Sequence, residues 1–358
     1  MDRINIQAST DYEVLIGKGL IDSCGTHIRE LLFRAQKALI VTDSNVAPLY
    51  LARVKSSLER EGFSVSEYVF EAGEEKKNIE SIAGMWAVMA KDEFTRTDIV
   101  VSLGGGVATD MGGFAAATFL RGIKVVQIPT SLLAMADAAI GGKTGIDLPQ
   151  GKNLAGAFHQ PVMVIEDTDC LATLSPETFT EGMAEVIKYA FIMDPDLYVM
   201  LSDIASQGKA MQLQDDIDTV TKILISCVKD KAEVISQDEH DNGRRQILNY
   251  GHTVGHVIER NSNFTLAHGV CVAKGMGIIA DACLKAGLTT EKTAGNIKEL
   301  IKAYGLPAGD PITAEEAVAG AMNDKKKRGE SISVILVNEI GKAEIKRMTP
   351  EEFTEFLR

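Results

Sequence analysis

The sequence predicts an α/β N-terminal domain with a Rossmann-like parallel sheet, followed by a mainly α-helical C-terminal domain. Three observations lead to this prediction. At 358 residues the chain is long enough for two typical domains. In its first half, short apolar runs alternate with helical patterns, as they do in βαβ units. From about residue 175 the β-branched runs give way to helical periodicity, so we place the domains at residues 1–170 and 171–358.

Each expected element follows from its own pattern. Apolar runs bounded by polar residues are expected to be buried strands, and apolar residues at helical spacing indicate helices. The expected strands of the first half are 37–43, 63–70, 98–106 and 123–129, with helices at 46–61, 78–91 and 107–118. In the second half, helices are expected at 176–192, 195–206, 214–236, 246–260, 270–286 and 291–303, with one late strand at 331–337 that could belong to a small hairpin.

Composition and charge exclude several classes of function. A net charge of −13 with no broad basic stripe argues against general affinity for nucleic acids. The five cysteines are odd in number and widely spaced, without a Cys-x-x-Cys pair, which is typical of reduced thiols in a cytoplasmic protein. The N-terminus does not resemble a signal peptide, and the apolar stretches are too short to span a bilayer. We therefore expect a cytoplasmic protein without nucleic-acid or membrane partners.

A strand, a glycine cluster and a helix of small residues follow one another in "VVSLGGGVATDMGGFAAA" (100–117). Glycines let backbone N–H groups approach a pyrophosphate, and a helix N-terminus attracts anions. The spacing is not that of the usual dinucleotide fingerprint, because Thr109 stands where a glycine would be. The cluster alone fits a ligand loop or a tight turn. Asp43, at the end of an earlier strand, could bind a ribose hydroxyl or cap a helix.

A second glycine-rich block, residues 129–161, reads as a long loop, and loops of this kind inside a compact domain are usually functional. Lys143 follows a Gly-Gly pair, and Lys152 and Asn153 follow another glycine. Lysines flanked by small residues can reach an anionic ligand, and Arg121 offers a further cation. A sugar phosphate that also carries a carboxylate would need about this many positive groups, which favours a binding role over solvated surface lysines.

Three of the six histidines gather within a short stretch: His252 and His256 lie one helical turn apart and His268 follows. They could be metal ligands, proton carriers or packing residues. Catalytic zinc commonly takes three protein ligands. Glu185 and Lys188 are three residues apart within an apolar helical segment, and a buried carboxylate needs a metal or a cation. The spacing favours a metal site over buried ion-pair histidines and leaves the ligand set open.

Taken together, these motifs resemble those of the 3-dehydroquinate synthases, a family of the sugar phosphate cyclases. The resemblance extends from about residue 40 to 340 and is carried by "GGGVATDMGGFAA", "PTSLLA", "GGKTGI", "GKNLAGAFHQP", "GMAEVIKYA", "RQILNYGHTVGH", "HG" and "DKK". It implies a homodimeric lyase of the shikimate pathway of aromatic amino acid biosynthesis. Such an enzyme converts 3-deoxy-D-arabino-heptulosonate 7-phosphate to 3-dehydroquinate and phosphate. The steps are transient oxidation by NAD, phosphate elimination, re-reduction and intramolecular aldol closure.

The resemblance also implies roles for single residues, with NAD and one divalent metal, zinc or cobalt, bound between the domains. The implied metal ligands are Glu185, His252 and His268. Groups implied to surround the substrate are Lys143, Asn153, Lys188, Lys231, Arg245, Asn249, His256, Arg121 and Lys325 or Lys326. Positions implied to contact NAD are Asp43, Asn45, Glu74, Lys77, Gly105, Gly106, Asp110, Thr130, Ser131, Asp137, Lys143, Lys152 and Thr173.

Two stretches depart from the family pattern. Ala138 and Ala139 stand where the family commonly has paired serines, and Val270 and Cys271 stand where it usually has Glu-Ala. These changes leave room for a sister sugar phosphate cyclase acting on a related substrate. A metal-dependent polyol dehydrogenase is a more distant alternative, since such enzymes lack the lysines at 143 and 152.

Overall fold

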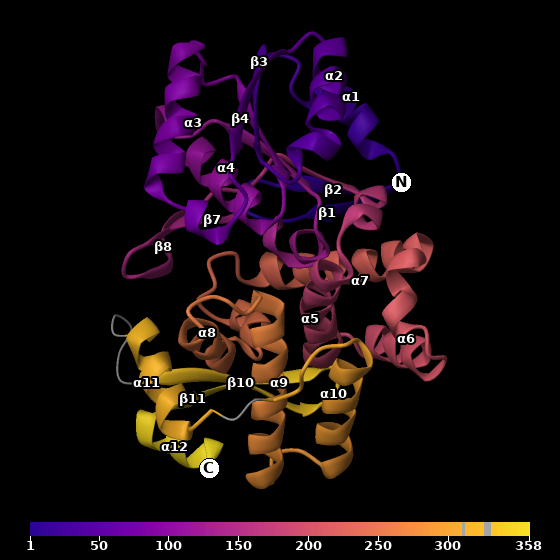
Figure 1. The fold of residues 1–358 in the computed structure, drawn as a ribbon, viewed down its shortest axis with the longest axis vertical. Helices are drawn as coiled ribbons and strands as arrows, with labels where there is room; N and C mark the ends of the chain where they lie inside the picture. Colours follow the sequence, from indigo (N-terminus) through magenta and orange to yellow (C-terminus); the bar gives the residue numbers. More distant parts are fainter. Residues whose placement is uncertain (310–311, 326–330) are drawn as a thin grey trace. The chain divides into compact units, whose positions relative to one another are not determined.

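The structure is a computed structural model that describes residues 1–309, 312–325 and 331–358. The chain forms two compact units (Figure 1). Unit 1 comprises Met1–Leu174 together with Ile217–Glu239, and unit 2 comprises Ser175–Asp216 together with His240–Arg358.

Unit 1 is built on a seven-stranded sheet with the strand order β1-β2-β9-β6-β5-β3-β4. Its strands are β1 (Asp2–Ile6), β2 (Tyr12–Gly17), β3 (Lys37–Asp43), β4 (Ser64–Phe70), β5 (Ile99–Gly104), β6 (Lys124–Pro129) and β9 (Met163–Asp167). Only the β1–β2 pair is antiparallel, and the remaining pairs are parallel. The predicted Rossmann-like sheet is thus confirmed, with an N-terminal hairpin that the sequence pattern did not indicate.

Helices cover both faces of this sheet, as the predicted βαβ units require. They are α1 (Cys24–Leu31), α2 (Ala52–Arg60), α3 (Ile79–Lys91), α4 (Gly106–Thr118) and α7 (Ile217–Gln237). In Figure 1, α3 and α4 lie on one side of β3 and β4, and α1 and α2 lie on the other. Leu39 and Val41 of the sheet pack with Met85 of α3 and Met111 of α4 in one buried cluster.

The glycine-rich segment predicted as a long loop forms an antiparallel hairpin, so the loop prediction was wrong. Its strands are β7 (Lys143–Leu148) and β8 (Gly151–Phe158), which pair Gly145 with Gly156. A Cβ at Gly156 would lie 2.2 Å from the carbonyl oxygen of Thr144, so only glycine permits this strand spacing. Glycine-rich sequence here reflects a close approach of two backbones, which composition alone cannot separate from a loop.

Helix α7 packs on unit 1, although the sequence division at residue 170 placed its residues in the second domain. Val228 and Ile235 of α7 share a buried cluster with Ile4 and Val14 of the N-terminal hairpin. The apolar face of this hairpin is covered by α7. Helical periodicity predicted that α7 exists, but it carries no information about which sheet face the helix covers.

Unit 2 is mainly helical, as predicted, and also contains the hairpin anticipated at residues 331–337. Its elements are α5 (Pro176–Ile192), α6 (Pro195–Ser206), α8 (His252–Asn261), α9 (His268–Lys285), α10 (Glu291–Ala303), α11 (Ala314–Lys325), α12 (Pro350–Leu357) and the strands β10 (Ile332–Glu339) and β11 (Lys342–Met348). Ser175 caps α5 by accepting a hydrogen bond from the backbone N–H of Thr178, with Pro176 at the first helical position.

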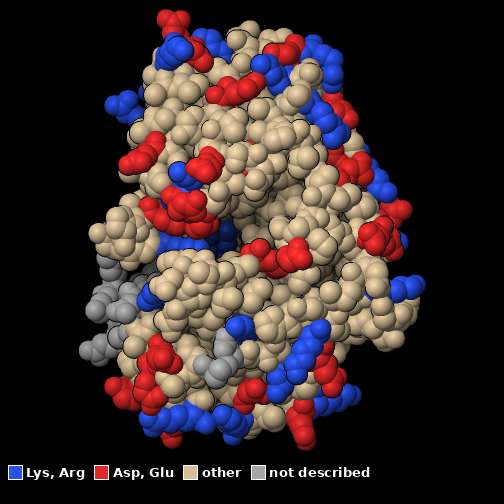
Figure 2. Space-filling model, viewed as in Figure 1, with Lys and Arg blue, Asp and Glu red and all other residues tan. Residues whose placement is uncertain are grey.

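The surface carries charges of both signs. On the face shown in Figure 2, acidic and basic side chains are interspersed. In the described residues, no helix has both the length and the apolar character needed to cross a membrane.

One buried group in unit 1 stands out as unsatisfied. The Glu166 side chain, on β9, is fully buried, and neither of its carboxylate oxygens has a hydrogen-bond partner in the described part of the chain. Burial raises the pKa of Glu166 well above its ordinary value, partly opposed by the charge of Lys231. A buried polar group without a partner costs about 1–3 kcal/mol, so this side chain opposes the stability of the sheet.

We predict that Glu166→Leu raises the free energy of unfolding by about 1–3 kcal/mol at pH 7.5. Because the folded-state pKa is raised, the folded protein binds a proton that the unfolded chain releases, so wild-type stability falls as pH rises above about 4.3. The difference in the free energy of unfolding between Glu166→Leu and the wild type should therefore grow from pH 4.5 to pH 7.5. Urea denaturation at both pH values measures it, with Glu166→Gln as the control for loss of titration alone. An unchanged or lower stability of Glu166→Leu at pH 7.5 would contradict the prediction.

Candidate active site

Glycines allow α8 and α9 to pack backbone against backbone in unit 2. A Cβ at Gly275 would lie 2.0 Å from the carbonyl oxygen of Gly251, and a Cβ at Gly255 would lie 2.8 Å from that of Cys271. Gly251 also has φ 79°, a left-handed conformation that favours glycine, and it immediately precedes α8. The glycines flanking His252 in the sequence are therefore requirements of helix packing.

A second close contact brings the start of α9 against α5. A Cβ at Gly269 would lie 2.1 Å from the carbonyl oxygen of Glu181. His268, the first residue of α9, is thereby held beside the buried segment of α5 that carries Glu185 and Lys188. Two glycine contacts thus gather residues that are far apart in the sequence.

The gathered side chains form a compact group of imidazoles around a buried carboxylate. The Nε2 atoms of His252 and His268 lie 3.5 Å and 3.6 Å from Oε1 of Glu185. His256 is the third imidazole, and a ligand atom of each histidine lies within 4.8 Å of those of the other two. The side chain of Glu185 is 2% exposed, so its charge is compensated inside the protein. A divalent cation could be held either by the three histidines or by Glu185 with two of them.

Both histidines nearest to Glu185 are oriented by a contact on their other ring nitrogen. Nδ1 of His252 lies 3.1 Å from the carbonyl oxygen of Tyr250 and can only donate to it, which leaves Nε2 as the electron-pair donor facing Glu185. Nδ1 of His268 lies 3.6 Å from Oε2 of the buried Glu259. Contacts of this kind fix the tautomer and ring orientation of metal-binding histidines.

The two imidazoles have opposite electrostatic environments. Burial, together with the Lys188 charge and despite the attraction of Glu185, lowers the pKa of His252 to about 3. Burial also acts to lower the pKa of His268, but the neighbouring carboxylates of Glu185 and Glu259 raise it to about 10. Glu185 and Glu259 therefore favour positive charge at this position, and either a proton or a metal cation can supply it.

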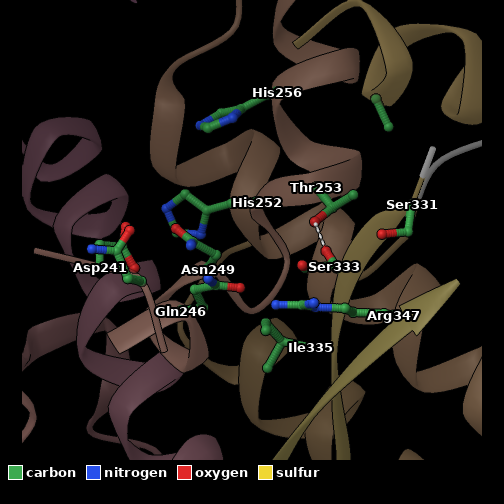
Figure 3. A pocket seen from close by; sticks show the side chains of 12 residues that line it. Asp241, Gln246, Asn249, His252, Thr253, His256, Ser331, Ser333, Ile335 and Arg347 are labelled. Atoms are coloured by element: carbon green, nitrogen blue, oxygen red, sulfur yellow. Dashed lines mark hydrogen bonds between the residues drawn. The ribbon is translucent and has the colours of Figure 1, made fainter. Parts of the chain in front are cut away.

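Several predicted substrate-binding groups belong to unit 2, as this cluster does. Lys188 is fully buried and forms an ion pair with Glu185. Arg245 is buried in the short helical segment Arg244–Asn249 that leads to Asn249. A cavity of about 420 Å³ lies next to the histidines and is bounded by the loop before α8, by α8 and by the β10–β11 hairpin (Figure 3). Asn249, His252 and His256 line it.

In unit 1, the predicted nucleotide residues meet at the carboxyl edge of the sheet. The chain leaves β3 towards β4 and returns to β5 on the other side of β3, so the strand order reverses between β3 and β5. Such a reversal is the usual ligand site of doubly wound sheets. Asp43 ends β3, while Gly105 and Gly106 lie between β5 and α4, whose first turn contains no acidic residue. This geometry suits a pyrophosphate at the start of α4.

Other predicted residues of unit 1 are joined by ion pairs and a hydrogen bond. Lys77 Nζ lies 2.6 Å from Oδ2 of Asp110 and 2.6 Å from Oδ1 of Asn153. Lys152 Nζ lies 3.2 Å from Oε1 of Glu74.

The structure also shows contacts for three further predicted residues. Lys231 of α7 forms an ion pair with Asp137. Thr173 contacts the hydroxyl of Tyr50, with 2.6 Å between the two oxygens.

Asp43 caps the turn that follows β3, which is one of the two roles that the sequence predicts for it. Its Oδ1 accepts hydrogen bonds from the backbone N–H groups of Asn45 and Val46, at 2.8 Å and 3.0 Å. Its Oδ2 would lie 3.3 Å from a Cβ at Gly104, so the ends of β3 and β5 are adjacent. One carboxylate oxygen thus organises the turn, and the ribose contact stays a prediction for the other.

Not every predicted residue joins these groups. Arg121 is exposed and lies between the end of α4 and the start of β6, at the amino edge of the sheet and therefore opposite the glycine turn. The side chain of Lys325 and the whole of Lys326 lie outside the described residues. Glu259 was not predicted from the sequence, although it lies seven residues after His252 and three after His256, on the same face of one helix.

Family comparisons agree with this arrangement over both units. Residues 67–181 match the family described as 3-dehydroquinate synthase N-terminal, and residues 182–327 match the one described as 3-dehydroquinate synthase C-terminal. The chain is 40% identical over 349 residues to the 3-dehydroquinate synthase of Clostridium acetobutylicum, covering 97% of this chain and 96% of that protein. The chain belongs to the 3-dehydroquinate synthase family.

Solved structures place the synthase fold among related enzymes. A 2-epi-5-epi-valiolone synthase from Streptomyces hygroscopicus, solved with NAD⁺ and Zn²⁺ bound, has a TM-score of 0.88 and 26% identity, covering 99% of this chain and 98% of that one. An NADH-dependent butanol dehydrogenase from Thermotoga maritima has a TM-score of 0.66 and 16% identity, covering 100% of this chain and 97% of that one, and it shares the fold alone.

We predict that the glycine contact between α8 and α9 is required for the stability of the fold. Gly275→Ala places a Cβ against the carbonyl oxygen of Gly251 and should lower the free energy of unfolding by about 1–3 kcal/mol. Gly295→Ala is the matched control, because a Cβ on that α10 glycine would meet nothing within 4 Å. The control should gain about 0.5–1 kcal/mol from helix propensity. Chemical denaturation of both variants measures the difference, and equal stability would refute it.

Proposed function

We propose that this chain is a 3-dehydroquinate synthase, a phosphate lyase. Its substrate is 3-deoxy-D-arabino-heptulosonate 7-phosphate, and its products are 3-dehydroquinate and phosphate. The observation that carries the proposal is the 40% identity to a 3-dehydroquinate synthase over 97% of the chain. The histidine cluster of unit 2 and the glycine turn of unit 1 supply the two kinds of site that this chemistry needs. Phosphate release and product identity, assayed with the heptulosonate phosphate, NAD and zinc, test it directly.

The residues of unit 2 fit a divalent metal, zinc or cobalt. In a tetrahedral zinc site with bonds of about 2.0–2.1 Å, neighbouring ligand atoms lie about 3.3 Å apart. The distances of 3.5 Å and 3.6 Å from Glu185 to His252 and His268 are close to that value. We therefore propose these three residues as the ligands, which leaves His256 for the substrate. When bound, the metal would act as a Lewis acid towards substrate oxygens.

The glycine turn and its neighbours fit NAD. Asp43, Gly105, Gly106, Thr130 and Ser131 follow three adjacent strands, β3, β5 and β6, at the edge where the strand order reverses. Support comes from the valiolone synthase of the same fold, which was solved with NAD⁺. When bound, NAD would accept a hydride from the carbon that bears a substrate hydroxyl and later return it.

The remaining residues bind and orient a substrate with two anionic ends. Arg245 can bind a carboxylate through two parallel hydrogen bonds, and its burial in unit 2 fixes its geometry. Buried Lys188 holds Glu185 in place and adds positive charge beside the cluster. His256, on the cavity wall, can accept or donate a proton near the phosphate. Lys143, Lys152 and Asn153 are proposed to contribute from unit 1.

Two finer predictions belong to the same proposal. A homodimer is expected from the family. A cytoplasmic location is expected too, and the burial of all five cysteines agrees with it. A sister cyclase remains the alternative to test, because a valiolone synthase has this fold with 26% identity, but the 40% identity to a 3-dehydroquinate synthase favours the heptulosonate phosphate.

The proposed ligand set predicts different effects for two neighbouring histidines. His268→Ala should lose stoichiometric zinc and nearly all activity. His256→Ala should keep one zinc per chain while losing activity, because this imidazole is assigned to the substrate. Metal content after gel filtration, measured by atomic emission, separates the two. Loss of zinc from His256→Ala would instead favour the set of three histidines.

The proposed chemistry regenerates NAD within each turnover. One NAD per many substrate molecules should therefore support continued phosphate release without a steady rise of absorbance at about 340 nm. Simultaneous assays of phosphate and NADH measure this. Accumulation of NADH in proportion to product would contradict the proposal and point to a dehydrogenase.

A further inference from the structure

The cavity beside the histidines has one wall formed by residues that follow the family match, which ends at residue 327. Figure 3 shows it closed on one side by the β10–β11 hairpin, from which Ser333, Ile335 and Arg347 extend. Its other lining residues come from the loop before α8, from α8 itself and from the ends of the described segments around α11 and β10. The hairpin therefore contributes to the same space as His252 and His256.

Arg347 is the positively charged residue that the hairpin contributes to the cavity lining. It lies on β11 directly opposite Ser333 of β10, and its side chain extends into the cavity (Figure 3). Among the described residues it forms no ion pair and no hydrogen bond, and the one carboxylate lining the cavity, Asp241, lies on the far wall. An arginine directed into a cavity without a protein carboxylate to bind is available for an anionic ligand.

The groups around Arg347 suit a tetrahedral oxyanion. Ser331 and Ser333 line the cavity with hydroxyls, and Asn249 and His256 add an amide and an imidazole. The hydroxyl of Thr253, which also lines the cavity, donates its hydrogen to the carbonyl oxygen of Ser333 at 3.3 Å. A planar guanidinium binds phosphate through two parallel hydrogen bonds, which hydroxyls and an imidazole can complement.

We propose that Arg347 binds the phosphate group of the substrate. This inference rests on the proposed function, which supplies a substrate with a phosphate at one end and a carboxylate at the other. Arg347 shares its cavity with Asn249 and with His256, and His256 is the imidazole proposed to lie near the phosphate. Arg245, expected at the carboxylate, is buried and does not line this cavity. The arrangement assigns the two arginines to opposite ends of the substrate.

Arg347→Gln in the holoenzyme, with NAD and zinc, tests the assignment. The KM for the heptulosonate phosphate and the inhibition constant of inorganic phosphate should each rise roughly tenfold, the effect of losing one charge-assisted contact. The dissociation constant of 3-dehydroquinate, which carries a carboxylate and no phosphate, should stay unchanged. Arg347→Lys should recover part of the loss, since it keeps the charge without the paired hydrogen bonds.

Lys346→Gln is the matched control, because Lys346 neighbours Arg347 on β11 but does not line the cavity. It should leave all three constants unchanged. If Lys346→Gln weakened binding as much as Arg347→Gln does, surface charge alone would explain the effect. If Arg347→Gln weakened the binding of 3-dehydroquinate, Arg347 would lie at the carboxylate. Either result overturns the inference. An active wild type with unchanged constants in Arg347→Gln also overturns it. An inactive wild type would remove the proposed function itself.

Discussion

The contact between the backbones of α8 and α9 is the constraint on which the site in unit 2 depends. Without side chains at Gly251, Gly255 and Gly275, the two helices approach closely enough for His252 and His268 to reach one carboxylate. His268 stands at the N-terminus of α9, where the helix dipole disfavours a positive group. The carboxylates of Glu185 and Glu259 outweigh that effect, so the position attracts a cation.

Unit 1 shows a different use of buried charge. Lys77 with Asp110 and Lys231 with Asp137 place positive and negative groups together in or near the interior. Pairs of this kind contribute little net stability, because desolvation offsets their attraction. These ion pairs hold their polar atoms in fixed positions. Among the described residues, no group donates a hydrogen bond to either carboxylate oxygen of Glu166, and nothing in the structure explains its presence in the sheet.

The sequence predicted the alternation of strands and helices well, because buried parallel strands are almost continuously apolar and the helices keep a 3.6-residue period. It did not predict that residues 143–158 form a hairpin, since glycines required by close strands look like glycines required by a turn. It predicted the residues of the histidine cluster through motifs, but not Glu259, whose contact with His268 depends on how α8 meets α9. Arg347 had no signal in the sequence, because only the strand register of the hairpin directs it into the cavity.

The placement of α7 has a consequence for how the chain can fold during synthesis. Unit 1 is discontinuous: Ser175–Asp216 of unit 2 is translated before Ile217–Glu239 completes unit 1. Until α7 has left the ribosome, Ile4 and Val14 of the N-terminal hairpin have no apolar partner at Val228 and Ile235. The first residues made are therefore among the last of unit 1 to be covered. A fragment ending at Leu174 would expose that apolar face permanently, so unit 1 is not separable from the chain by cutting at the end of its first segment.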